Sequence, residues 1–289
     1  MKFIHVKNIN LKNILLHTGF LLTFILFSYN ISYSQIDTTA INDTIIDKDT
    51  IIFKQIISDT LFDSNQIISL IYIPKKTKKY SIKFVYDSTQ LIPTSKFALK
   101  NKALAAINGG FFDMDKGGSV TYFETHDSMI SKNVSKNNKW GKSSNLLNGI
   151  VILTKNDSVI IEKAKQQHYY ELSNNENQAL ITGPVLLLNS ESVEMPDKKF
   201  VTKRHPRTCL CKTKNFIVFV TVDGRQKNAQ GMNLYELQEF LKSINCIDAV
   251  NLDGGGSTTM YLNDKGIVNF PSDKTGERPV SNALIISKN

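Results

Sequence analysis

The segment that most constrains this chain reads Asn251-Leu252-Asp253-Gly254-Gly255-Gly256-Ser257. It places one carboxylate, Asp253, at the end of an apolar, strand-like run and follows it with three glycines. Glycine has no Cβ atom, so a ligand can come close to the backbone N–H groups of such a turn. Consecutive N–H groups of this kind can bind an anion. Asp-Gly is also ordinary hairpin chemistry, but a hairpin does not need three glycines followed by a hydroxyl cluster.

A second segment repeats this order of residue types. The run Ala105–Ile107 ends in Asn108, Gly109 and Gly110, and the acid Asp113 follows after two phenylalanines. Two strand ends of the same kind suggest one pocket, because irregular backbone at one edge of a sheet is where sites form. Three further motifs lie between the two segments: Thr182-Gly183-Pro184, Arg204-His205-Pro206-Arg207-Thr208 and Val222-Asp223-Gly224-Arg225.

The order of these motifs resembles the phosphodiester glycosidase family. The resemblance also includes Gly231–Leu234 ahead of a predicted helix, Phe270–Asp273 and Arg278–Ser281, and runs from about Ile67 to Ile286. It implies a hydrolase that cleaves a sugar-1-phosphodiester of the α-N-acetylglucosamine-1-phosphate type, releasing free sugar and a phosphomonoester. The sequence departs from the family after Arg207-Thr208, where Cys209-Leu210-Cys211 replaces a pattern of Ala, an aliphatic residue and Gly. Loss of that Gly adds a side chain near the site, so the departure concerns the shape of the substrate pocket more than the reaction class.

The chemistry of such a reaction assigns roles to these residues. Cleavage at C1 passes through an oxocarbenium-like state, which carboxylates stabilise, while the phosphate needs positive charge and N–H donors. We expect Asp253 and Asp223 to serve the first need, and Arg207 and His205 to contact the phosphate; these four are the predicted catalytic residues. The predicted substrate-binding residues are Asn108, Gly109, Gly110, Asp113, Gly183, Thr208, Gly254, Gly255, Gly256, Ser257 and Arg278. No loop has a recognisable metal-ligand spacing, so we expect no metal and no cofactor.

The N-terminus has the layout of a secretory signal peptide. Three lysines precede the apolar run Leu21–Phe27, and small residues at Ser32–Ser34 precede Gln35. We expect residues 1–34 to be cleaved on export to the periplasm or outside the cell. An uncleaved membrane anchor is the alternative, since the uncharged stretch is almost long enough to span a bilayer. Residues 35–54 are expected to form a linker or an irregular first strand, and residues 55–289 a single catalytic domain.

Charge and cysteine content narrow the remaining classes. The formal net charge is +9, but the lysines are scattered and the one dense run, Lys75–Lys79, is typical of a solvated loop, so we expect no nucleic-acid partner. The chain has three cysteines, Cys209, Cys211 and Cys246. Either all are buried thiols or Cys246 pairs with one of the other two.

The predicted fold is α+β, with a large twisted mixed β-sheet as its core and few helices. Leu234–Asn245 is the strongest predicted helix, with Asn233 and Glu236 at its start and apolar residues at helical spacing. Between the predicted strands Phe216–Val222 and Ala249–Leu252 it would form a crossover that brings Asp223 and Asp253 to one sheet edge.

Several further elements are expected. Ile67–Ile73 and Tyr80–Tyr86 are predicted to pair as a hairpin, and Gln178–Leu188 to form one strand. A short helix is expected from Thr94 to about Lys100, with Thr94 as its cap.

Two other functions remain open at this level. A non-catalytic cell-surface carbohydrate-binding protein would not need Asp253, a basic cluster and glycine turns together. A phosphodiesterase that cleaves P–O instead of C–O is harder to separate from the glycosidase. A nucleotide-binding protein is disfavoured, because neither glycine run continues as a P-loop or a dinucleotide fingerprint.

Overall fold

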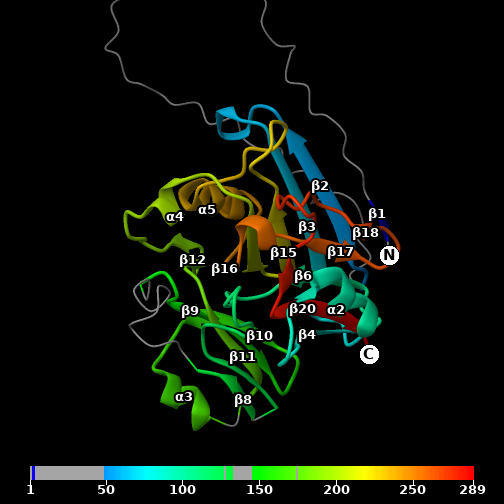
Figure 1. Cartoon of the computed structure of the whole chain (residues 1–289), viewed down its shortest axis with the longest axis vertical. Helices are drawn as coiled ribbons and strands as arrows, with labels where there is room; N and C mark the ends of the chain where they lie inside the picture. The colour runs from blue at the N-terminus through cyan, green and yellow to red at the C-terminus, as the bar shows by residue number, and fades with distance from the viewer. Residues whose placement is uncertain (1, 4–48, 127, 133–144, 174) are drawn as a thin grey trace, which may run out of the picture.

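The computed structural model describes residues 2–3, 49–126, 128–132, 145–173 and 175–289. Three β-sheets and a few helices surround a shared core, and the helices α4 and α5 cover one face of the largest sheet (Figure 1). The fold is α+β, as the sequence predicts, although the core is divided among three sheets. Of the predicted signal peptide, the structure describes residues 2–3, and the rest of that segment lies outside the described residues.

The largest sheet has eight strands in the order β1-β2-β3-β15-β14-β16-β12-β13. β1 and β2 run parallel, and the other pairs of this sheet are antiparallel. Its central strands are buried at almost every position, as expected when both faces of a sheet are covered. The bounds are β1 Lys2–Phe3, β2 Ile52–Ser58, β3 Gln66–Pro74, β12 Val185–Leu188, β13 Glu191–Ser192, β14 Arg207–Lys212, β15 Phe216–Val222 and β16 Asp248–Asn251.

The two faces of this sheet pack against different layers. In β15, Phe219 joins the core shared with the other two sheets, whereas its neighbours Val218 and Val220 pack with Leu237 and Phe240 of α5. This is the alternation of side chains expected along a strand.

Two five-stranded sheets cover the other face. One has the order β10-β9-β11-β7-β8 and the other β18-β17-β6-β20-β4. The bounds are β4 Tyr80–Tyr86, β6 Ala105–Asn108, β7 Phe123–Thr125, β8 Ser128–Ser131, β9 Gly149–Thr154, β10 Val159–Lys163, β11 Glu176–Thr182, β17 Met260–Leu262, β18 Gly266–Ile267 and β20 Asn282–Lys288, with β5 Ile92–Pro93 and β19 Pro279–Val280 as a separate pair.

The helices are short, and the longest of those described is the predicted one. α5 begins after Asn233, whose side chain accepts from the Glu236 N–H while the Glu236 side chain accepts from the Asn233 N–H. This reciprocal capping box is the one expected from the sequence. The bounds are η1 Leu61–Asp63, α2 Thr94–Lys100, α3 Gln167–Glu171, α4 Lys199–Thr202, α5 Leu234–Ser243 and η3 Gly255–Ser257. The helix at Thr94 is confirmed, but Pro93 occupies the cap position.

Two expectations about strands were wrong. β3 and β4 do not pair as a hairpin: β3 lies between β2 and β15, while β4 pairs with β20 in another sheet. β3 is buried along its whole length, so it needs a neighbour on each side. The predicted strand Gln178–Leu188 is interrupted at Gly183 and Pro184, and its halves β11 and β12 belong to different sheets. β2 begins at Ile52, so regular structure starts inside the segment predicted as a linker or irregular strand.

Cys211 and Cys246 form a disulfide that joins β14 to the segment after α5, and Cys209 is a buried free thiol. This matches one of the two alternatives left open by the sequence.

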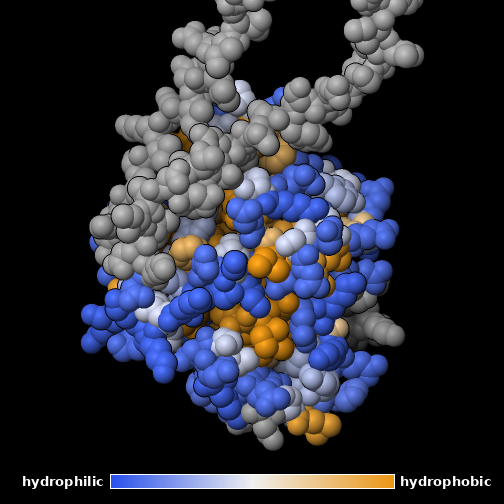
Figure 2. Space-filling view, turned by 180° about the vertical axis from the view of Figure 1, so that it is seen from behind, coloured by the Kyte–Doolittle hydropathy of each residue, from blue (hydrophilic) through white to orange (hydrophobic). Residues whose placement is uncertain are grey.

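No helix among the described residues is long and apolar enough to cross a membrane. Seen from the back, the molecule is hydrophilic around its margin and exposes apolar residues near its middle (Figure 2).

Candidate active site

The ends of three neighbouring strands form the candidate site. β14 lies between β15 and β16 and is antiparallel to both, with Arg207 opposite Val222 and Cys209 opposite Asn251. The start of β14 therefore lies beside the ends of the other two strands. Asp223 directly follows β15, and Asp253 follows β16 by two residues. This confirms that the α5 crossover brings both acids to the same edge, although β14 separates their strands.

Asn108, at the end of β6, fixes the backbone of the acid-bearing turn. Its Oδ1 accepts from Thr208 Oγ1 at 2.7 Å and from the Thr259 N–H at 3.1 Å, and its Nδ2 donates to the Asp253 carbonyl at 2.7 Å. Asn108 and Thr208 are completely buried. They join the predicted site, but their polar atoms are used within the protein, so they orient the turn instead of contacting sugar hydroxyls.

The glycine turn is enclosed by three other loops. Gly255 donates its N–H to the Pro206 carbonyl at 2.9 Å and has φ +63°, a conformation that favours glycine. A Cβ atom added at Gly255 would lie 2.9 Å from Nη2 of Arg225, and one added at Gly256 would collide with Asp273 and Arg278. The absence of side chains lets these groups approach the turn.

Two arginines therefore face the glycine turn. Arg278 makes a bidentate ion pair with Asp273, with distances of 2.6 and 2.7 Å, which holds its guanidinium beside Gly256. Arg225 is exposed at the tip of the turn after β15. Our sequence reasoning did not select Arg225; the signal that could have identified it is its position two residues after Asp223 in a glycine-containing turn.

Asp253 is the partly exposed acid of the site. Its Oδ1 accepts from the Gly254 N–H at 2.9 Å. Burial raises the pKa of Asp253 to about 6, and the Ser257 hydroxyl, Arg278, the Gly254 N–H and Arg225 oppose that rise. Desolvation favours the neutral acid, whereas the nearby donors and cations favour the carboxylate. A raised pKa with a specific set of donors and cations around it makes Asp253 a candidate functional group.

Asp223 is more deeply buried, with 1% of its surface exposed. Its Oδ1 accepts from Asn269 Nδ2 at 2.9 Å and from the Phe270 N–H at 3.0 Å, while its Oδ2 has no hydrogen-bond partner among the described residues. Burial raises the pKa of Asp223 to about 6 against these two hydrogen bonds. Asp223 lies at the predicted edge, but its oxygens face the protein interior.

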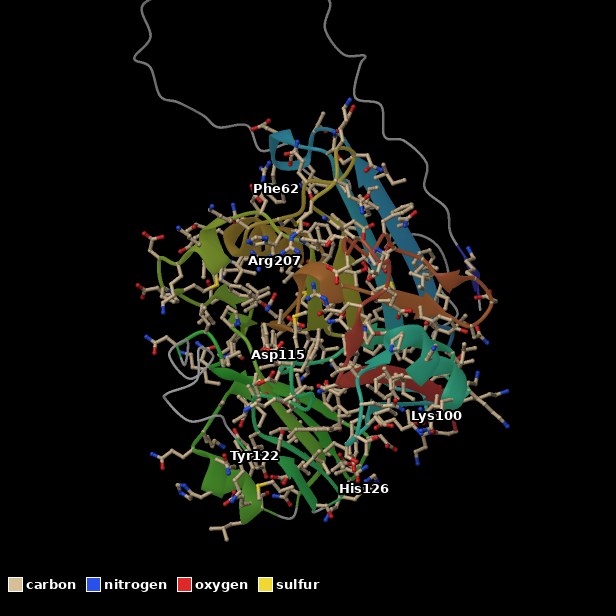
Figure 3. The ribbon with its side chains drawn as sticks, viewed as in Figure 1. Phe62, Lys100, Asp115, Tyr122, His126 and Arg207 are labelled. Carbon is tan, nitrogen blue, oxygen red and sulfur yellow. A yellow bond between two sulfur atoms is a disulfide. The ribbon has the colours of Figure 1, made fainter. Side chains whose placement is uncertain are left out.

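Arg207 occupies a different place from the one its sequence suggests. It is 1% exposed, and it donates from Nε to the Met232 carbonyl and from Nη2 to the carbonyls of Phe200 and Lys203. Figure 3 shows it in the upper half of the molecule, near α4 and α5. Desolvation lowers the pKa of Arg207 to about 9, still well above neutral. Its hydrogen bonds link loops of the protein, so it is not placed for a bidentate phosphate contact.

His205 also differs from expectation, because it is not a cation near neutral pH. Burial and the positive charges of Arg207, Arg225 and Lys203 lower the pKa of His205 to about 4. Its Nδ1 lies 3.5 Å from Nη2 of Arg225, so the neutral ring borders the exposed guanidinium.

Four other predicted residues make hydrogen bonds that hold the backbone of the site or of their own turn. Gly109 and Gly110 donate their N–H groups to the carbonyl and the side-chain oxygen of Asn282. The Gly183 carbonyl accepts from Asn251, two residues before Asp253. Asp113 Oδ1 accepts from two backbone N–H groups of its own turn. A separate groove between residues 73–82 and 156–160 contains none of the predicted site residues.

The comparisons with known proteins agree with the ordered motifs. The family model described as phosphodiester glycosidase matches residues 101–287. Human N-acetylglucosamine-1-phosphodiester alpha-N-acetylglucosaminidase is 28% identical over 184 residues, which cover 58% of this chain and 33% of the human protein. The chain therefore matches about a third of the length of this curated relative.

Two solved structures share the fold. The zebrafish N-acetylglucosamine-1-phosphodiester alpha-N-acetylglucosaminidase catalytic domain, auto-inhibited by its pro-peptide, superposes with a TM-score of 0.63 at 22% identity, covering 83% of each chain. A hypothetical protein from Synechocystis superposes with a TM-score of 0.59 at 13% identity, covering 83% of this chain and 64% of the other. The family model spans more than half of the sequence, and its matched region contains both Asp223 and Asp253. The chain belongs to the phosphodiester glycosidase family.

Proposed function

We propose that the protein hydrolyses a sugar-1-phosphodiester of the α-N-acetylglucosamine-1-phosphate type and releases free sugar and a phosphomonoester. The observation that carries this proposal is a partly exposed acid, Asp253, whose pKa is raised to about 6, next to a glycine turn that two arginines face. The acid suits a developing positive charge, and the arginines suit a phosphate.

The proposed reaction breaks the bond between C1 and the phosphate oxygen. The bonding electron pair leaves with the phosphate, where Arg225 and Arg278 neutralise the added charge. Asp253, in its ionised form, stabilises the positive charge at C1, either by direct contact or by activating the water whose oxygen bonds to C1. The attacking water keeps one proton as the new sugar hydroxyl, and the other passes to Asp253 and then to solvent. Phosphate leaves readily, so the reaction has little need of a general acid, and the site does not require a second reacting carboxylate.

The first experiment replaces Asp253. Asp253→Asn keeps the local hydrogen bond from Gly254 but removes the charge, so turnover of methyl α-N-acetylglucosamine-1-phosphate should fall by about a thousandfold. The exposed Asp264 provides a matched control, and Asp264→Asn should retain wild-type turnover. Thermal midpoints of both variants should stay close to that of the wild type. Near-wild-type turnover by Asp253→Asn would remove this residue from the mechanism.

A second measurement decides which bond is broken. In water labelled with ¹⁸O, hydrolysis at C1 puts the label into the free sugar, whereas a phosphodiesterase that cleaves P–O puts it into the phosphate. Label in the phosphate would overturn the glycosidase proposal. Sugar binding without turnover of any phosphodiester would support the alternative of a non-catalytic carbohydrate-binding protein.

We also propose that the mature protein is exported after cleavage of residues 1–34. The Cys211–Cys246 disulfide supports an oxidising compartment, where such bonds persist.

Because β2 begins at Ile52, we propose that the catalytic domain starts there instead of at residue 55. Mass spectrometry of the protein from its native host should give a mature N-terminus at Gln35, and an intact N-terminus in the membrane fraction would favour an uncleaved anchor.

A further inference from the structure

Phe270 is an exposed aromatic residue on the loop that follows β18. Its side chain is 52% exposed, although the preceding residue, Asn269, is buried. Both polar groups of the Phe270 backbone are fixed by the turn after β15. Its N–H donates to Asp223 Oδ1 at 3.0 Å, and its carbonyl accepts from Gln226 Nε2 at 3.2 Å. The exposed ring thus projects from backbone that is held on both sides.

The residues around Phe270 connect this loop to the glycine turn. Asn269 Nδ2 donates to the Thr258 carbonyl at 3.1 Å as well as to Asp223. Asp273, three residues after Phe270, packs against Gly256 with Arg278. Arg225, from the same turn as Asp223 and Gln226, packs against Gly255. Phe270 therefore belongs to the group of loops that encloses the acid-bearing turn.

Asp223 is a buried carboxyl group whose position is costly for stability, which points to a functional reason for its hydrogen bonds. A carboxylate that is 1% exposed has a high desolvation cost, and one of its oxygens has no partner among the described residues. Its side-chain hydrogen bonds go to Asn269 and to Phe270. A single exposed apolar residue is common on protein surfaces, but the backbone of Phe270 is in addition hydrogen-bonded to the buried carboxyl group of Asp223.

We propose that Phe270 is a substrate-binding residue that stacks on the sugar ring, and that Asp223 is a positioning residue that holds it there. This inference rests on the proposed function. A sugar presents an apolar C–H face between its hydroxyl edges, and aromatic side chains supply apolar area with few rotatable bonds for such a face. The arginines would then hold the phosphate while Phe270 holds the sugar. Asp223 takes part through Phe270 and does not contact the reacting atoms.

The main test compares Phe270→Ala with Phe270→Tyr. Loss of the ring should raise KM for methyl α-N-acetylglucosamine-1-phosphate by about tenfold, with kcat within about twofold of the wild type. Phe270→Tyr keeps the stacking surface and should restore KM. Tyr169 in α3 is 48% exposed and lies far from the glycine turn (Figure 1), so Tyr169→Ala is the matched control and should leave KM unchanged. An unchanged KM in Phe270→Ala would overturn the proposal.

A binding measurement separates this inference from the proposed function. N-acetylglucosamine-1-phosphate should raise the thermal midpoint of the wild type, and much less that of Phe270→Ala, whereas inorganic phosphate should shift both equally. The stacking proposal would be overturned if Phe270→Ala reduced the thermal shifts caused by the two ligands equally. It would also be overturned if the sugar phosphate did not shift the thermal midpoint of the wild type. If the wild type binds the sugar phosphate but turns over no phosphodiester, the proposed function fails while stacking is still decided by this comparison.

The role of Asp223 is tested by its coupling to Phe270. Asp223→Ala removes the acceptor of the Phe270 N–H and should raise KM about threefold, whereas Asp223→Asn keeps an oxygen that can accept both hydrogen bonds and should return KM to near the wild-type value. Gln226→Ala removes the other anchor and should also raise KM about threefold. If these two alanine variants act by releasing Phe270, neither should add to the effect of Phe270→Ala in a double variant. Additive effects, or loss of kcat in Asp223→Asn as severe as in Asp253→Asn, would overturn the positioning role.

Discussion

Asp223 and Asp253 show how two acids with similarly raised pKa values can have different tasks. Burial raises both pKa values to about 6. Asp223 is closed off and uses one oxygen to hold a neighbouring loop, whereas Asp253 is partly exposed beside the cations. A raised pKa marks a desolvated group, and access decides whether that group can meet a substrate.

The first prediction at the scale of the residue concerns pH. If Asp253 acts as a carboxylate, kcat/KM should rise with pH through a midpoint near 6, the value to which burial raises its pKa. His205, whose pKa is lowered to about 4, is already neutral across this range and should add no second step there. The measurement is a pH profile of kcat/KM for the wild type and for Asp223→Asn, and both profiles should rise with the same midpoint. A rate that falls through pH 6 would make Asp253 an acid donor.

The second prediction concerns stability. The folded-state pKa of Asp223 is raised above its unfolded value, so this group favours the folded state most below about pH 4, and that contribution is lost as pH rises through about 6. Asp223→Asn removes this dependence. The difference in thermal midpoint, variant minus wild type, should therefore increase between pH 4 and pH 7. A difference that stays constant over this range would show that Asp223 does not titrate with a raised pKa.

At the scale of the element, side chains from other loops pack closely against the glycine turn. Gly255→Ala would introduce a Cβ at φ +63°, costing about 1–2 kcal/mol, and would press against Arg225. Because Arg225 is exposed and flexible at its end, its guanidinium should move away. We expect KM for the phosphodiester to rise several-fold.

Gly266 provides the control for this prediction. It has φ +75°, and an added Cβ would meet nothing within 4 Å. Gly266→Ala should therefore lose similar stability with no change in KM, as measured by thermal unfolding and steady-state kinetics. Equal KM values in the two variants would argue against Arg225 as a phosphate-binding residue.

Elements with local signals were predictable from the sequence, and those decided by distant contacts were not. α5 follows from a capping box and helical spacing inside one short segment. The partners of β3 depend on β2 and β15, the latter about 150 residues away, and two adjacent strand-like runs look like a hairpin whether or not they pair. Gly183 and Pro184 are residues that commonly interrupt a strand, but our prediction continued the strand through them.

At the scale of the whole molecule, the ordered motifs identify the edge at which the site forms but not the direction of each side chain. Asn108, Asp223 and Asp253 were expected near one edge, and they lie there. Arg207 was expected to face a phosphate, but its charge is turned inward to backbone carbonyls, while Arg225 occupies the exposed position. Sequence spacing does not reveal which of two nearby arginines meets buried acceptors, because those acceptors come from other loops.

The Cys211–Cys246 disulfide also closes the chain into a covalent ring. The ring contains all residues from 212 to 245, including β15, α5 and the turn that carries Arg225. A protease that cuts this turn at the exposed Lys227 would leave the two fragments joined by the disulfide. On a denaturing gel they would separate only if the disulfide were first reduced. A single cut in this part of the candidate site would thus leave the chain in one covalent piece for as long as the disulfide stays oxidised.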